Sequence, residues 1–143
     1  MKVLNLFPSS VIQDKILISQ NIKKEMIEEI EIMLSNSKNK DDKGVLDSWT
    51  GDTQGFEYIF KNEKFSVLLQ EIKKTINKYI KHLGIDDNKI DIYMNRSWAT
   101  VSYGKEKILP HKHKQSHISF AYYLKKNSQD SNIMFYDEHF QNE

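Results

Sequence analysis

The sequence predicts an α+β fold in a single domain, residues 1–143, because the spacing of apolar residues changes once along the chain. Residues 1–87 hold two stretches with helical spacing, whereas residues 88–143 alternate with the period of a strand. A chain of 143 residues has the usual length of one domain. We therefore expect short strands and two long helices first, and β-structure from there to the end of the chain.

The amino-terminal part is predicted to contain two short strands, a helix and a loop. Residues 3–7 and 11–18 alternate weakly on either side of Pro8, which favours two short strands. Apolar residues then follow one face of a helix over residues 22–34. Residues 35–55 are rich in Ser, Asn, Asp, Gly and Lys, which is typical of a long surface loop.

A second and stronger helix is predicted after the loop. Asn62 is a candidate N-cap, and Gly84 stands where a left-handed cap ends a helix. We expect the apolar stripe of this helix to be buried beneath a sheet; its members are Phe65, Leu68, Leu69, Ile72, Ile76, Tyr79 and Ile80.

The carboxy-terminal part is predicted to be β-structure. Residues 90–103 alternate over one long strand or two strands joined by a bulge, and residues 133–136 form a further strand. In residues 110–124 one side of the alternation is expected to pack on the helix, and the other side to line a pocket. A plain half-buried strand has nearly the same pattern. The packing side consists of Ile118, Phe120, Tyr122 and Leu124.

Composition excludes several classes of function. The formal charge is +1 and acids are interleaved with bases, which disfavours a basic nucleic-acid arm. There is no Cys, hence no disulfide, thiolate metal site or cysteine nucleophile. No stretch reaches the length of a membrane span, so we expect a cytoplasmic protein. Arg96 is the single Arg, so an anion site must depend mainly on Lys, hydroxyls, backbone or metal.

His111 and His113 are the candidate metal ligands. Separated by one residue, they would lie on the same side of a strand, where imidazoles can hold iron, copper, nickel or zinc. Two His in a Lys-rich turn can also be merely solvated, because short His-x-His pairs arise by chance.

The chain resembles the iron(II) and 2-oxoglutarate-dependent oxygenases related to prolyl 4-hydroxylases, in particular the branch common in bacteriophage and marine bacterial genomes. The resemblance takes in the amino-terminal LFPSSVI, the Trp49 loop, the second helix, the Trp98 strand with Gly104, and H-K-H followed by S-x-x-Y-Y-L. It implies a double-stranded β-helix, a jelly-roll or cupin-like core, with the two long helices supporting it from its amino-terminal side.

The resemblance also implies a site and a reaction. His111 would be the first iron(II) ligand, and His113 occupies the position that usually holds the carboxylate. Tyr103 and Tyr123 fall near positions that hold 2-oxoglutarate, the co-substrate, although core packing is an equal alternative for both. Lys125 would lie on the same side of a strand as Tyr123. It can take the place of the Arg that pairs with the co-substrate in this family, or it can be an ordinary surface Lys. The implied function is a dioxygenase that hydroxylates a substrate C–H bond.

The sequence departs from the family at its carboxy-terminal end, where a distal iron-binding His and a following Arg or Lys are expected. His139 is the last His and only four residues follow it. We therefore expect a β-helix that is incomplete at the C-terminus, with impaired or no activity. A homodimer can cover its open edge. If the gene belongs to a phage, the protein works in the host cytoplasm.

Two alternatives to an active oxygenase stay open. One is a non-catalytic fragment or binding module that keeps the scaffold. The other is a cupin-like metal protein that adds His117 and a carboxylate, Asp137 or Glu138, to the histidine pair. The substrate is equally open among a protein side chain, a nucleobase and a small molecule, because variable loops select it.

Overall fold

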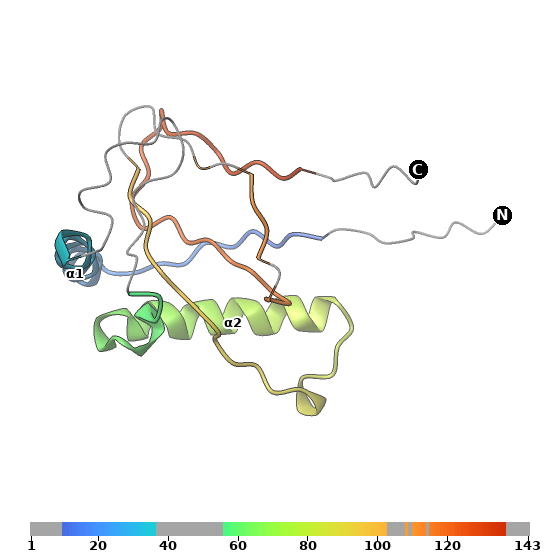
Figure 1. The fold of residues 1–143 in the computed structure, drawn as a ribbon. Helices are drawn as coiled ribbons and strands as arrows, with labels where there is room; N and C mark the ends of the chain where they lie inside the picture. Colours follow the sequence, from blue (N-terminus) through green and yellow to red (C-terminus); the bar gives the residue numbers. More distant parts are fainter. Residues whose placement is uncertain (1–9, 37–55, 103–107, 109, 114, 137–143) are drawn as a thin grey trace.

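The computed structural model describes residues 10–36, 56–102, 108, 110–113 and 115–136. The two α-helices are α1 (Gln20–Asn36) and α2 (Ser66–His82). Three short 3-10 helices complete the regular elements, η1 (Ile59–Lys61), η2 (Glu63–Phe65) and η3 (Asp87–Lys89). Figure 1 shows α2 from the side and α1 end-on, with extended segments of the chain above α2.

Helix α1 confirms the first predicted helix. Its apolar stripe faces inward, and Met26 and Met33 are buried at its centre. The helix ends where Ser35 Oγ and Asn36 Nδ2 both donate to the carbonyl oxygen of Ile32, at 2.8 and 3.0 Å. These two side chains satisfy a carbonyl that the next turn would otherwise have used, which is a common way for a helix to stop.

Helix α2 confirms the second predicted helix and its Gly84 end signal, whereas the predicted cap Asn62 lies one short element earlier. The Asn62 side chain accepts a hydrogen bond from the Lys64 backbone N–H at 3.0 Å, and so caps η2, which leads directly into α2. At the other end Gly84 adopts φ +74°, and the Ile85 N–H reaches back to the Ile80 carbonyl at 3.1 Å. This left-handed cap needs glycine because a Cβ would be strained there.

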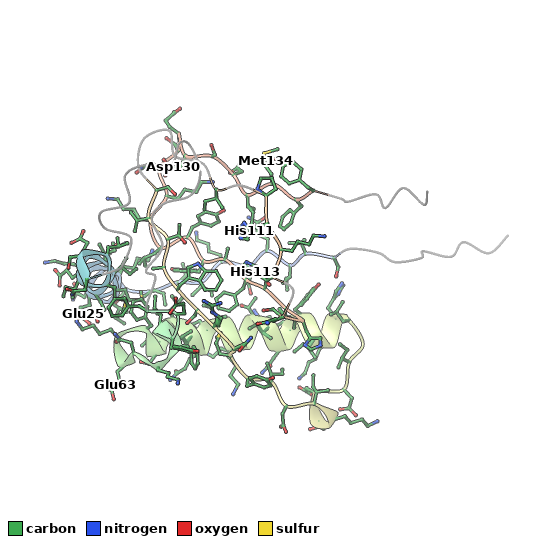
Figure 2. The ribbon with its side chains drawn as sticks, in the orientation of Figure 1. Glu25, Glu63, His111, His113, Asp130 and Met134 are labelled. Atoms are coloured by element: carbon green, nitrogen blue, oxygen red, sulfur yellow. The ribbon has the colours of Figure 1, made fainter. Side chains whose placement is uncertain are left out.

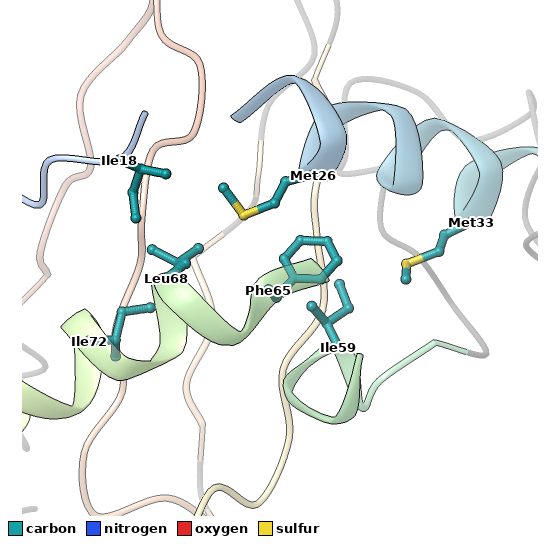
Figure 3. Packing of buried hydrophobic residues seen from close by; sticks show 7 residues of the cluster. All are labelled: Ile18, Met26, Met33, Ile59, Phe65, Leu68 and Ile72. Carbon is teal, nitrogen blue, oxygen red and sulfur yellow. The ribbon is translucent and has the colours of Figure 1, made fainter. Parts of the chain in front are cut away.

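The hydrophobic core lies where α1, η2 and the first turns of α2 meet (Figure 3). Met26 is fully buried, and Phe65 is 3% exposed. Leu69, Ile76, Tyr122 and Leu124 pack on this cluster from outside, so the predicted stripe of α2 does face the interior. The buried members of the cluster are Ile18, Met26, Met33, Ile59, Phe65, Leu68 and Ile72.

The predicted sheet is wrong for the described residues, and with it the double-stranded β-helix. Residues 11–18, 90–102 and 133–136 form no strand, and β-pairing among the described residues is limited to isolated bridges, such as the parallel bridge between Tyr58 and Ser97. A strand exists only where a neighbour supplies a ladder of backbone hydrogen bonds, and alternation of side chains does not supply one. The predicted strand of residues 3–7 and the loop of residues 37–55 lie outside the described residues.

Side chains, and not a ladder, fasten the first extended segment to α2. Tyr79 Oη donates to the carbonyl oxygen of Ser10 at 2.9 Å, and Lys78 Nζ lies 2.9 Å from Asp14 Oδ2. Ile16 and Ile18 follow and bury against the core. An alternating segment can thus bury one side on a helix without joining a sheet.

Neither described helix has the length and apolar character needed to cross a bilayer.

Replacing Ile72 with Ala is expected to lower the free energy of unfolding by about 2–5 kcal/mol, because the buried side chain leaves a cavity. Ile72 is 5% exposed within the core cluster. The urea midpoint measures the effect, and Leu17→Ala is the matched control because Leu17 is 81% exposed. Equal midpoints for the two variants would show that the α2 stripe is not the core.

Candidate metal-binding site

The structure brings His111 and His113 together. Their ring centroids are 5.0 Å apart and the rings are nearly perpendicular, at 86°. Both residues lie on an extended segment, so residues two apart project to one side. Figure 2 shows the pair beside each other above α2. The segment then turns, with the Ser116 N–H donating to the His113 carbonyl at 3.2 Å.

Trp98 and Arg96 support the pair from the preceding segment. The Trp98 and His113 ring centroids are 5.4 Å apart, tilted by 51°. The Arg96 guanidinium carbon lies 5.7 Å from the centroid of the Trp98 ring, within the range of a cation–π contact. Arg96 Nη2 also lies 3.8 Å from Glu57 Oε1. A row of side-chain contacts, referred to below as the stack, therefore runs from Arg96 through Trp98 to the two histidines, with tilted and perpendicular rings.

The stack is positioned by backbone bonds around Ser97. The Ser97 N–H donates to the Glu57 carbonyl at 2.9 Å, and its own carbonyl accepts from the Ile59 N–H at 3.2 Å. Its hydroxyl accepts from the Phe60 N–H at 2.9 Å. Because η1 is tied to the core through buried Ile59, these bonds hold Arg96 and Trp98 against the core.

The surroundings of His113 favour its neutral form. The pKa of His113 lies below the ordinary imidazole value of 6.5, first because neighbouring groups remove water from it, and then because His111 and the positive Arg96 are close. A neutral imidazole has the free lone pair that a metal requires. His113 is therefore in the ligating form at neutral pH.

The spacing of the two rings fits a shared metal ion. An imidazole nitrogen ligates at about 2.0–2.1 Å, so each ring centroid lies about 3.2 Å from the metal and two adjacent ligand rings are about 4.5–5.3 Å apart. The observed 5.0 Å lies within this interval. The described residues contain no group of three or more His, Asp or Glu placed to hold a metal. The separation of the pair is therefore compatible with a shared metal ion, and imidazole suits iron(II) among other metals.

The predicted co-substrate residues lie apart from the histidines. Tyr123 and Lys125 line a cavity of about 730 Å³ beside α1, and the lining of that cavity includes neither His111 nor His113. The other residues of the prediction are scattered. His117 is exposed, whereas Tyr103, Asp137, Glu138 and His139 lie outside the described residues.

Comparison of the chain with protein-family models, with curated proteins and with solved structures finds no match.

Sequence reasoning missed the contribution of Arg96 and Trp98. The sequence pattern places Trp98 in a strand, and it singles out Arg96 only as the one Arg of the chain. The spacing Arg-x-Trp carries a usable signal, because residues two apart on extended backbone lie on the same side and an Arg can cover a Trp ring. The pattern does not identify which residue Trp98 contacts, because nothing in the sequence pairs Trp98 with His113.

Arg96→Gln is expected to raise the pKa of His113, because it removes a nearby positive charge that disfavours the imidazolium form. The rise should stop short of 6.5, since desolvation is the larger cause and persists. Titration of the imidazole proton resonances measures it. Arg96→Lys keeps the charge and should leave the pKa low, whereas a pKa that does not move in Arg96→Gln would refute this electrostatic account.

Proposed function

We propose that this chain binds a divalent transition metal, iron(II) first among them, through the imidazoles of His111 and His113. The observation that carries the proposal is the pair of rings at a centroid separation of 5.0 Å, with His113 held in its neutral form. Both histidines are exposed to solvent, and His113 contacts a Trp ring whose segment is bonded to η1 and so to the core.

The reaction class we propose is 2-oxoglutarate-dependent hydroxylation, impaired or lost in this chain because the described residues offer two metal ligands, and its support is the residue pattern around the pair. Iron(II) would supply dioxygen activation there, while 2-oxoglutarate supplies two electrons. The chain's own residues hold and orient the metal. His111 and His113 provide two nitrogen ligands, and Trp98 fixes the plane of the His113 ring. Ligands with fixed ring orientation bind more tightly, because less side-chain freedom is lost on binding.

A non-catalytic metal-binding module is the second candidate, and one observation favours it. Tyr123 and Lys125, the residues proposed for the co-substrate, line a cavity that excludes both histidines. An oxygenase of this class needs the co-substrate beside the metal, because the two react with each other. The described arrangement therefore supports metal binding more directly than it supports turnover.

An anaerobic titration with iron(II) is expected to saturate at one metal per chain. His111→Ala and His113→Ala should each weaken binding by at least about tenfold, since losing a ligand costs more than losing an outer partner of one. His82→Gln is the matched control, because His82 lies in the last turn of α2 outside the site. His117→Ala tests the cupin-like alternative, in which His117 is also a ligand and its loss would weaken iron(II) binding as well. Equal binding by all variants would refute the histidine site.

Incubation with iron(II), 2-oxoglutarate and dioxygen is expected to yield little or no succinate above a protein-free reaction. The described residues supply two ligands, and a metal held by two protein ligands has poorly defined geometry for catalysis. Succinate analysis by mass spectrometry tests this. Robust production that depends on His111 and on added iron would show instead that another residue or a second subunit completes the ligand set.

A further inference from the structure

A lysine-rich cavity lies between the first turns of α1 and the segment of residues 123–126. Its volume is about 730 Å³, within the range of pockets that hold small molecules. The two walls come from parts of the chain about a hundred residues apart, so the fold itself assembles the cavity. Ile27 and Leu124 contribute apolar surface to it, and Leu124 also packs on the core, which fixes that wall.

The cavity carries an excess of positive charge. Lys23 and Lys24 of α1 belong to its lining, as do Lys125 and Lys126 of the second segment. Glu28 and Glu31 are the acids of its lining, which leaves four lysines against two glutamates. Like charges brought together from two segments repel each other, so the arrangement is most stable when an anion lies between them.

Of the four lysines, Lys24 and Lys126 already have a partner, whereas the ammonium groups of Lys23 and Lys125 are available to a ligand. Lys24 lies 3.8 Å from Glu28 Oε1, and Lys126 donates to Asn132 Oδ1 at 2.6 Å. Within the described part of the chain, Lys23 and Lys125 have no carboxylate partner. Each ammonium has three donors in free rotation, which suits a group with oxygens on several sides more than the planar fork of a carboxylate, for which Arg is preferred.

We propose that this cavity binds a small polyphosphate-bearing molecule, with the phosphates held between Lys23 and Lys125. The charge excess on two facing walls suits a ligand with several negative charges. Tyr123 adds an aromatic ring to the lining, and Lys126 Nζ lies 5.3 Å from its centroid. The half-exposed ring is a platform for a nucleobase, so a nucleoside triphosphate fits better than inorganic polyphosphate.

The experiment titrates the full chain with ATP and separately with tripolyphosphate, in EDTA and at low ionic strength, by equilibrium dialysis. EDTA removes any metal from the histidine pair, and His111→Ala should bind ATP as the unaltered chain does. The proposal goes beyond metal binding, so its failure leaves the histidine site untouched. Saturable binding of ATP that weakens as salt rises is expected, because screening reduces attraction between charges.

The double variant Lys23→Gln/Lys125→Gln is expected to bind ATP at least about tenfold more weakly, since two charge-assisted contacts are lost. Lys15→Gln/Lys73→Gln is the matched control, with equal loss of charge outside the cavity. Glu28→Gln should instead tighten binding about threefold, because it removes a negative charge and releases Lys24. A gain in affinity cannot come from misfolding.

Tyr123→Ala distinguishes the two sources of polyphosphate. It should weaken ATP binding and leave tripolyphosphate binding unchanged if the ring stacks on the base. Absence of binding by both ligands at millimolar concentration would overturn the proposal. So would equal loss in the cavity and control double variants, or binding of 2-oxoglutarate in place of ATP with the same dependence on Lys23 and Lys125.

Discussion

The burial of Met26 against the turn that carries Phe65 is the contact on which the rest of the structure depends. Met26 is fully buried and Phe65 nearly so, and α1 meets the remainder of the chain at η2 (Figure 3). Glu29 reinforces this junction, since it accepts from Asn62 Nδ2 at 2.9 Å and pairs with Lys64, which lowers the pKa of Glu29. An unbranched Met suits the position because it adapts to an aromatic neighbour.

Two of the extended segments are attached directly to this helical core. Tyr79 and Lys78 hold the segment of residues 10–14, and Ser97 is bonded to residues 57–60. Each attachment is local, so no continuous ladder transmits order from one segment to the next. One route from the core to the histidine pair runs from Ile59 through Ser97 to Trp98 and the His113 ring.

Helical periodicity in the sequence was sufficient to predict both helices and the Gly84 end signal, because a helix closes its hydrogen bonds within its own segment; Asn62 caps η2 and not α2 itself. The predicted sheet was wrong for the described residues, because alternation of side chains does not supply a neighbouring strand. Tyr122 and Leu124 alternate as a strand would, yet they pack on helix side chains. The proximity of His111 and His113 follows from local geometry, whereas the neighbours of His113 and Lys125 are long-range partners that periodicity does not contain.

The distribution of cations connects the two sites. Arg96 is the single arginine of the chain, and it is already engaged with Trp98 and Glu57. Planar, weakly hydrated guanidinium suits an aromatic face, and at that position it also keeps His113 neutral. Anion binding is thereby left to lysines, whose strongly hydrated point charges need to converge before they hold a ligand. The α1 cavity is where the fold brings four of them together, so the proposed anion site draws on lysines while the one arginine of the chain lies beside the proposed metal site.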